Sequence, residues 1–235
     1  MADSTKVDGG AEIYVNKLEA ARRQIDAAIR MLLASEDSLA IQTVTAAGFG
    51  ILQNLLEHRG KYDLEELLKA GIYQSAVEYA EGRFTRDQLD GYYKGDIFTQ
   101  DLIIRIAKDV EEGKLSSPDE TNVEIAIGDA GRKERHDKMA KIPNFLKHAD
   151  NDQHGVLNLS KVDNIELLSH AASAFFALKK ELTDEMRVIL FLQRASHIEK
   201  FGYPGNKVEE HLASLTASER LAAGKKLLDI FRAEG

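Results

Sequence analysis

The chain contains 235 residues, of which 43% are hydrophobic and 30% are charged, and its formal net charge is −8 at pH 7. The lack of cysteine excludes disulfide bonds and thiolate metal sites. The acidic balance argues against a globally basic nucleic-acid-binding protein, although it leaves a local basic patch open. This composition is typical of a soluble globular protein rather than a disordered one.

The first residues, 1–10, are polar and contain no hydrophobic segment of the kind that a secretory signal needs. We therefore expect them to form a disordered leader. No apolar run approaches the length of a membrane span. Together these features predict a cytoplasmic protein that is not associated with a membrane. They leave its oligomeric state open.

Two long helices are expected at the beginning of the chain. Within residues 14–34, apolar side chains recur at a spacing of three and four, and charged side chains fall between them. A second apolar pattern follows the candidate N-cap residues Asp37 and Ser38. It ends before Gly60, which suits the position just past a helix C-terminus.

Two glycines, Gly48 and Gly50, lie inside the second expected helix. In a helix interior each glycine costs about 1 kcal/mol relative to alanine. One interpretation is that they allow the first two helices to approach closely. The alternative is that they weaken or kink the helix.

Further helix starts are indicated by capping patterns. Paired cap residues three positions apart occur at Thr85 with Gln88, Thr216 with Glu219 and, with aspartate in place of serine or threonine, Asp63 with Glu66. Thr183 begins another helix, which Gly202 closes, with Pro204 just beyond. Between these lies a strongly apolar helix within residues 163–181, and its expected buried residues are Ile165, Leu168, Ala172, Phe175 and Phe176.

These patterns predict an all-α fold of about eight to ten helices, packed as one bundle or as two abutting lobes. Residues 111–121 are the best linker candidate and would separate an N-terminal lobe, 11–113, from a C-terminal lobe, 119–235. Residues 122–127 alternate between apolar and other side chains, as in a strand. An isolated strand is unstable in water, so helix or irregular chain is favoured, but the alternative stays open.

The loop from Asp150 to Lys161 matches an EF-hand only in part. Asp150 and Asp152 stand at the first and third ligand positions, and Gly155 stands at the sixth. However, His154 occupies the fifth position, and Lys161 occupies the twelfth, where a bidentate glutamate belongs. Because both departures fall on ligands, we expect no calcium binding.

A transition-metal site is the alternative for the same stretch. His148, Asp150, Asp152 and His154 can offer imidazole and carboxylate ligands to zinc or manganese. Their spacing does not match a helix-borne motif such as H-E-x-x-H. The favoured interpretation is a polar turn that hydrogen-bonds to its own backbone. No metal or other cofactor is therefore expected.

The residues just before this turn form a candidate binding site. Pro143 suits the first position of a short helix. Asn144, Lys147 and His148 then share one face at i, i+3 and i+4. Phe145, Leu146 and Ala149 point elsewhere and are expected to anchor the turn in the core. The polar face can bind a ligand, or it can form a network that ties two helices together.

A basic segment leads into this turn. From Arg132 to His148 the chain carries six lysines and arginines against two acidic residues, a local net charge of +4. Such a run is usually a solvated helix face. Here Arg132, Arg135 and His136 share a helical face, and the turn can bring Lys147 and His148 near them. This arrangement favours a role in binding anions.

Two stretches of the chain resemble a known family. The segment KIPNFLKHADND and the opening helices, which contain KLEAARRQIDAAIRMLLASEDSLAIQTVTAA, resemble an uncharacterised family of helical bacterial proteins with a similar N-F-x-K-H-A-D segment in mid-chain. The likeness is confined to these parts of the chain. It implies an intracellular all-α protein and brings no established activity or catalytic residues.

A more distant likeness is to HEPN domains, which are helical bundles of bacterial defence and toxin systems. Nucleases of that type pair an arginine with a histidine a few residues further along. The pairs Arg132–His136 and Arg194–His197 are too closely spaced. Without such a pair to stabilise and protonate a phosphate, the likeness implies at most a HEPN-like bundle without nuclease activity.

Two classes of function remain. The leading hypothesis is a non-catalytic binding or regulatory protein, whose basic segment and polar turn bind a protein partner or a phosphate-bearing ligand. The rival is a metal-assisted hydrolase or nuclease of a bacterial defence or toxin system, centred on His148, Asp150 and Asp152. The chain lacks a glycine-rich phosphate loop and a nucleophile elbow, so no catalytic residue is assigned. His170 and His197 lie on apolar helices and are interpreted as core residues.

Overall fold

The computed structural model describes residues 14–94, 96–121, 142, 144–146, 154, 156–201 and 205–234. Helix is the only regular secondary structure that these described residues form. The predicted all-α fold is therefore confirmed. Residues 122–127, whose structure the sequence left open, lie outside the described part of the chain, as do Gly202 and Pro204.

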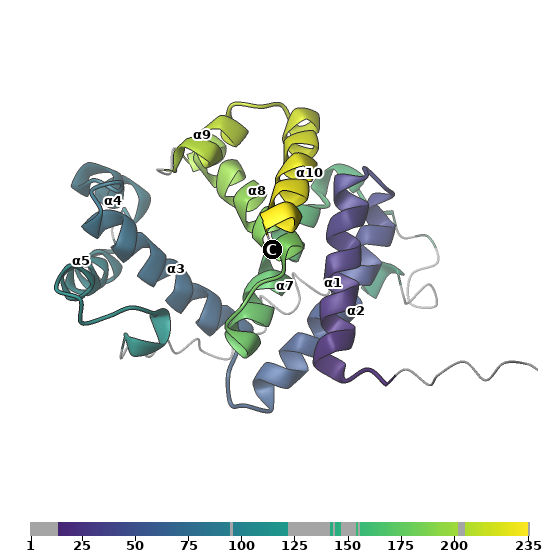
Figure 1. Cartoon of the computed structure of the whole chain (residues 1–235), viewed down its shortest axis with the longest axis horizontal. Coiled ribbons are helices and arrows are strands. Elements are labelled where there is room, and N and C mark those ends of the chain that lie inside the picture. The colour runs from purple at the N-terminus through teal and green to yellow at the C-terminus, as the bar shows by residue number, and fades with distance from the viewer. Residues whose placement is uncertain are drawn as a thin grey trace, which may run out of the picture.

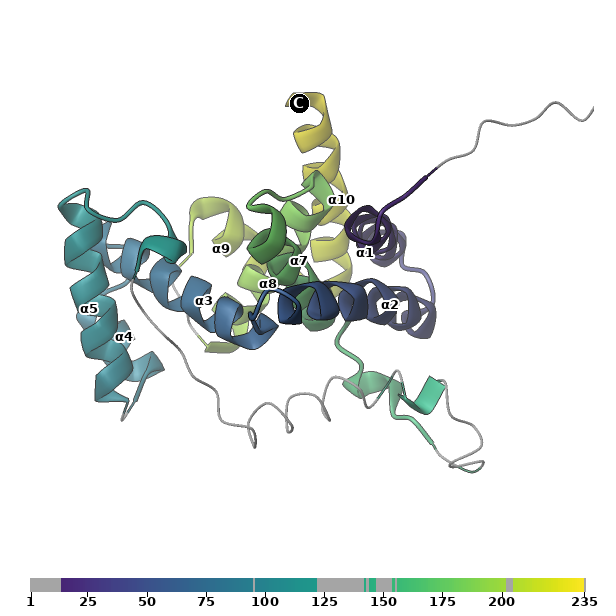
Figure 2. The same ribbon diagram turned by 90° about the horizontal axis from the view of Figure 1, so that it is seen from below.

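The first two helices lie at one end of the molecule, the next three lie at the other end, and the last helices lie between them. The helices are α1 (Lys17–Leu33), α2 (Ser38–Glu57), α3 (Asp63–Ala80), α4 (Arg86–Tyr92), α5 (Ile97–Glu111), α7 (Asn164–Lys179), α8 (Asp184–Phe201), α9 (Lys207–Ala213) and α10 (Ala217–Glu234), with short 3₁₀ helices η1 (Pro118–Glu120) and η2 (Leu159–Lys161). Figures 1 and 2 show α1 and α2 at one end, α3–α5 at the other, and α7–α10 between them.

Most predicted helix starts are confirmed by hydrogen bonds at the caps. The Asp37 carboxylate accepts from the backbone N–H groups of Leu39 and Ala40 at 3.0 and 2.9 Å. Reciprocal capping boxes form at Thr85 with Gln88 and at Thr216 with Glu219, and the Thr183 hydroxyl accepts from the backbone N–H of Met186. Gly60 follows α2 with a φ of +68°, a conformation that side chains disfavour.

The predicted cap at Asp63 is wrong. Asp63 is already the first residue of α3, and the N-cap residue Tyr62 forms no side-chain cap hydrogen bond. Asp63, Glu65 and Glu66 instead place three carboxylates in the first turn. Acidic groups are favourable there because the helix dipole is positive at this end. Lys61 adds an ion pair to Glu66 at 2.9 Å.

The helices bury two separate apolar clusters. The larger one joins α1, α2, α7, α8 and α10 and includes Ile25, Leu52 and Leu168. The smaller one joins α3, α4 and α5, and Ile198 of α8 packs against it. We call α3–α5 the outer lobe, and α1, α2, α7, α8 and α10 the main bundle. The described helices therefore do not group by the predicted boundaries, because α1 and α2 share a core with the C-terminal helices.

Helix α2 is long and apolar enough to cross a membrane by length and composition alone. This finding corrects the expectation that no apolar run approaches that length. In the fold, Ile41, Phe49 and Leu52 of α2 are buried in the larger cluster, where the helix contacts α1 and α7. The core thus accounts for much of its apolar character.

Gly48 lets α1 and α2 approach closely. A Cβ atom at Gly48 would lie 3.1 Å from Cγ1 of Ile25 and 3.2 Å from both the carbonyl oxygen of Ala21 and Cβ of Gln24. A Cβ atom at Gly50 would meet nothing within 4 Å. Of the two interpretations of these glycines, close approach is therefore confirmed for Gly48 but not for Gly50.

These two glycines form a matched pair for mutation. We expect Gly48→Ala to destabilise the protein by about 1 kcal/mol or more, because overpacking against α1 outweighs the gain in helix propensity. Gly50→Ala is expected to stabilise it by up to about 1 kcal/mol, because its extra methyl group enters open space. Urea unfolding followed by circular dichroism measures both effects. Equal stabilisation by both substitutions would contradict the close approach at Gly48.

Candidate functional site

Most of the binding residues predicted from the sequence lie outside the described part of the chain. This holds for Arg132, Arg135, His136, Lys147 and His148. Among the predicted binding residues, the structure describes Asn144, which is helical and exposed. The anion-binding role of the basic segment therefore stays a prediction.

The expectation that Phe145 anchors the turn in the core is wrong. Its side chain is 39% exposed, whereas the neighbouring Leu146 is half-buried. One residue along a helix corresponds to a rotation of about 100°, so the two side chains point in different directions. Leu146, which was also expected to anchor the turn, is therefore the more buried of the two, and Ala149 lies outside the described residues.

The alternative metal site also falls mainly outside the described residues. His154 is described and exposed, but His148, Asp150 and Asp152 are not described. Within the described ranges there is no group of three or more His, Cys, Asp or Glu side chains that could hold a metal ion. A metal at the 148–154 stretch therefore stays an untested alternative.

A large cleft lies between the outer lobe and the main bundle. Its volume is about 880 Å³, and it is lined by residues of α3, α4, α5, α7 and α8. This volume falls in the range of small-molecule binding sites, which is roughly 300–1,000 Å³. Helix α3 contacts both α5 and α7, and it runs from the outer lobe toward the main bundle in Figure 1. Both lobes therefore supply walls of the same cleft.

The outer-lobe wall carries a group of apolar and aromatic side chains. Phe98 and Leu102 lie four residues apart on α5 and share one face, and Leu68 and Ile72 do the same on α3. Phe98 is 79% exposed, Leu68 is 42% exposed, and Tyr92 at the end of α4 is 41% exposed. Exposed apolar side chains that gather around one hollow mark a binding surface more often than scattered ones do.

Gly71 leaves part of this wall without a side chain. It lines the cleft from the middle of α3, and a Cβ atom placed there would meet nothing within 4 Å. Glycine inside a helix costs about 1 kcal/mol relative to alanine, and no packing contact requires it at this position. A side chain can therefore be added at Gly71 to fill the cleft without disturbing the fold.

The main-bundle wall is polar. Helix α7 contributes His170 and Ser173, and α8 contributes Gln193, Arg194 and His197. The Gln193 amide donates to Nε2 of His197 at 2.8 Å. The interpretation of the two histidines as core residues is corrected, because both are half-buried and line the cleft.

The imidazole of His197 is held in its neutral form. Burial lowers its pKa, and the nearby charges of Arg194 and Lys200 lower it further, against smaller opposing effects of Glu166 and Asp163. A neutral ring keeps a lone pair on Nε2 and can accept the hydrogen bond from Gln193. At neutral pH, His197 therefore adds no positive charge to the cleft.

Arg194 belongs to an ion-pair network that joins the two lobes. Its guanidinium donates to Oε1 of Glu78 on α3, and its Nε lies 3.9 Å from the Glu209 carboxylate on α9. The same Glu78 carboxylate accepts from Gln74 at 3.0 Å and lies 3.5 Å from Nη1 of Arg83. The charge of Arg194 is therefore neutralised by acidic groups of the protein.

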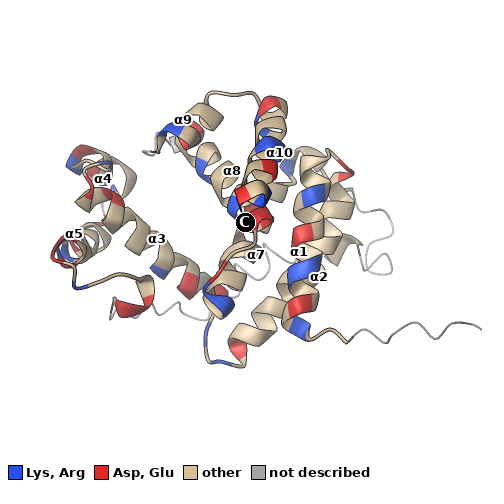
Figure 3. Cartoon of the chain, viewed as in Figure 1, with Lys and Arg blue, Asp and Glu red and all other residues tan. Residues whose placement is uncertain are grey.

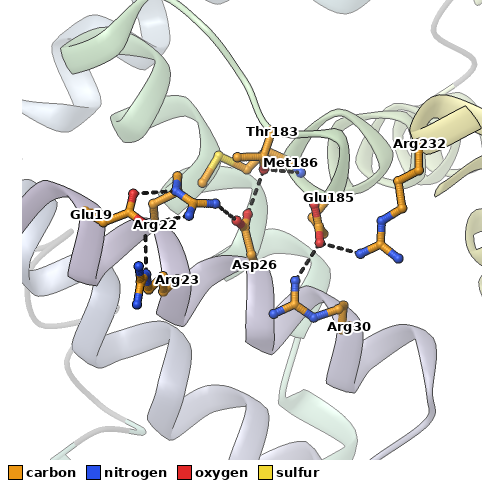
Figure 4. Close-up of polar contacts among 9 residues, drawn as sticks. All are labelled: Glu19, Arg22, Arg23, Asp26, Arg30, Thr183, Glu185, Met186 and Arg232. Atoms are coloured by element: carbon orange, nitrogen blue, oxygen red, sulfur yellow. Dashed lines mark hydrogen bonds and ion pairs between the residues drawn. The ribbon is translucent and has the colours of Figure 1, made fainter. Parts of the chain in front are cut away.

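A second polar cluster joins α1 to the start of α8 (Figure 4). The Thr183 hydroxyl donates to Oδ1 of the buried Asp26 at 2.7 Å, and Arg22 donates to Oδ2 at 2.7 Å. Burial raises the pKa of Asp26, while the hydrogen bond from Thr183 opposes that shift. Both oxygens of this carboxylate are thus committed to partners.

Glu185 forms the other half of this cluster. Arg30 of α1 and Arg232 of α10 both donate to its Oε1, at 2.5 and 2.7 Å (Figure 4). Burial alone would raise the pKa of Glu185, but hydrogen bonds from its own backbone and from both arginines hold it below the usual value. Charges of both signs also alternate along α1 (Figure 3). The cluster therefore links α1, α8 and α10 through paired charges.

No family model, curated protein or solved structure matches this chain. The resemblances to the N-F-x-K-H-A-D family and to HEPN domains therefore stay predictions. Among the described residues, the cleft between the outer lobe and the main bundle combines the volume of a ligand site with exposed apolar side chains and a polar wall.

Proposed function

We propose that this protein is a non-catalytic binding protein and that the cleft between the outer lobe and the main bundle holds a small organic ligand with an apolar body. The observation that carries this proposal is the gathering of Leu68, Tyr92 and Phe98 around a hollow of about 880 Å³. A ligand of this kind would cover apolar surface that is otherwise in contact with water, at a gain of about 25 cal/mol per Å².

The position of the cleft supports a regulatory use of that binding. Its walls come from two apolar clusters that are packed separately, and Ile198 and the Glu78–Arg194 pair link them. A ligand that touches both walls favours the arrangement in which the lobes face each other. Binding would thereby stabilise the outer lobe against the main bundle.

The proposal can be tested with N-phenyl-1-naphthylamine, an uncharged aromatic probe that fluoresces in apolar surroundings. We expect saturable binding to the wild-type protein. Phe98→Ser should raise the Kd by at least about fivefold, since losing about 1 kcal/mol of apolar contact has that effect. Gly71→Gln should also weaken binding, because it puts a polar side chain into the cleft.

Two substitutions outside the cleft serve as matched controls. Ile230→Ser removes a 50% exposed apolar side chain of α10, and Gly50→Gln fills open space on α2. Both should leave the Kd of the probe unchanged, and circular dichroism should show that all four variants are folded. Two results would overturn the proposal. One is absence of binding to the wild type, and the other is a Kd that Phe98→Ser and Gly71→Gln leave at the wild-type value.

A further inference from the structure

We infer that the cleft takes an organic anion, in which an apolar body ends in a carboxylate, sulfonate or phosphate group. This inference rests on the proposed binding function and adds the chemical class of the ligand. The guanidinium group of Arg105 on α5 is the group that would contact the anion. An arginine suits this role because its planar fork can donate two parallel hydrogen bonds to two oxygens.

Five hydroxyl groups in the cleft are already committed, including those of Ser75 and Tyr93, which share a hydrogen bond of 3.3 Å. Ser169 donates to the carbonyl oxygen of Glu166 at 2.8 Å, and Ser173 donates to that of Ser169 at 2.9 Å. Thr99 donates to the Asp96 carboxylate at 2.6 Å. The hydrogens of the Ser169, Ser173 and Thr99 hydroxyl groups are already donated to oxygen atoms of the protein. A ligand that breaks one of these hydrogen bonds to form its own gains little free energy.

The other charged groups of the cleft are committed as well. The Asp96 carboxylate caps α5, accepting from the backbone N–H of Thr99 at 3.0 Å, and these hydrogen bonds lower its pKa. The guanidinium of Arg194 is paired with Glu78. Neither group is available to a ligand without breaking an existing interaction.

Arg105 differs from these groups. It lines the cleft, its residue is exposed, and it forms no ion pair with any carboxylate in the described part of the chain. Its own helix offers Asp101 four residues before it and Asp109 four residues after it, spacings that normally permit pairing. Asp109 instead lies 3.9 Å from Nζ of Lys114. The cleft therefore contains one cation that no described acidic group neutralises.

The arrangement along α5 suits an amphipathic molecule. Phe98, Leu102 and Arg105 lie at i, i+4 and i+7 and share one face of the helix that lines the cleft. At a rise of 1.5 Å per residue, Arg105 lies about 10 Å along the axis from Phe98. A molecule with one or two rings and a terminal anionic group spans that distance, with its rings on Phe98 and its anion at Arg105.

A matched pair of probes tests this inference. 8-Anilinonaphthalene-1-sulfonate has the same ring systems as N-phenyl-1-naphthylamine and differs by its sulfonate group. We expect the wild type to bind the sulfonate probe about tenfold or more tightly than the neutral one, as expected for a charged hydrogen bond. Arg105→Gln should remove this advantage and change the Kd of the neutral probe by less than about twofold.

Lys108→Gln is the control, because Lys108 lies on the same helix and outside the cleft. It should preserve the preference for the sulfonate probe.

If the neutral probe binds and Phe98→Ser abolishes that binding, but the sulfonate gives no advantage, the binding function stands and the anion inference fails. Equal losses in Arg105→Gln and Lys108→Gln would also overturn the inference, since they would show only a general effect of charge. If neither probe binds, the proposed function fails and the inference fails with it.

Discussion

Replacing Glu78 with alanine is expected to destabilise the protein by about 3–5 kcal/mol, the range for removing one partner of a buried ion pair. The Glu78 residue is 1% exposed, and the Arg194 side chain that donates to it is 16% exposed. Without the carboxylate, Arg194 keeps a charge that is largely removed from water and has lost its nearest partner. Arg83 and Gln74 lose an acceptor at the same time.

Urea unfolding of the Glu78→Ala variant measures this effect directly. Glu81→Ala is the matched control, because Glu81 also pairs with Arg83 but is about half exposed, and it should change the free energy of unfolding by less than about 0.5 kcal/mol. Glu78→Gln keeps the shape and one acceptor oxygen, so its loss should lie between the two. An unchanged unfolding midpoint in Glu78→Ala would show that Arg194 finds another partner or reaches water.

This ion pair also shows what the sequence does not reveal. Glu78 and Arg194 are 116 residues apart, and neither belongs to a local motif. The helix starts at Asp37, Thr85 and Thr216 were predictable because a cap and the groups it binds lie within three residues of each other. Interactions between distant helices carry no comparable signal in a single sequence.

The cleft escaped prediction for the same reason. Its walls come from α3–α5 and from α7 and α8, which are distant in the chain and are brought together only by packing. From the sequence alone, His170 and His197 were indistinguishable from buried histidines of an apolar helix. Phe98 was equally indistinguishable from a core residue, because the hydrophobic pattern predicts which side chains are apolar and not which remain uncovered.

The incorrect burial of Phe145 has a different origin. Helical periodicity is informative over several turns, because many positions together fix the direction of the apolar face. The helical residues 144–146 form less than one turn, so either Phe145 or Leu146 could face inward. The longer helix α7 suffered less from this ambiguity. Of its five predicted core positions, Leu168, Ala172 and Phe175 are buried, whereas Ile165 and Phe176 are half-buried.

Arg220 is expected to be the second most sensitive polar residue, because it holds the C-terminal end of α9 against α10. Its residue is 7% exposed, and its guanidinium donates to the carbonyl oxygens of Leu212, Ala213 and Leu215 at 2.9, 3.3 and 3.0 Å. It also donates to Glu199 at 2.8 Å. A cation in this position adds donors at the C-terminal end of α9, where the intrahelical hydrogen bonds run out, and complements the helix dipole.

Arg220→Met keeps an apolar stem of similar length and removes every donor. We expect a loss of about 2–3 kcal/mol, because three carbonyl groups and the Glu199 carboxylate lose the donor that Arg220 supplies from a buried position. For a chain of this length, that loss lowers the Tm by about 5–10 °C in a thermal scan. Arg220→Lys should recover only part of the lost stability, since a single ammonium group cannot reach several carbonyls with the geometry of a fork.

Lys226→Met, at an exposed position on the same helix, is the control and should leave the Tm nearly unchanged. A full recovery by lysine would mean that Arg220 acts through its charge alone and that its hydrogen bonds to α9 contribute little.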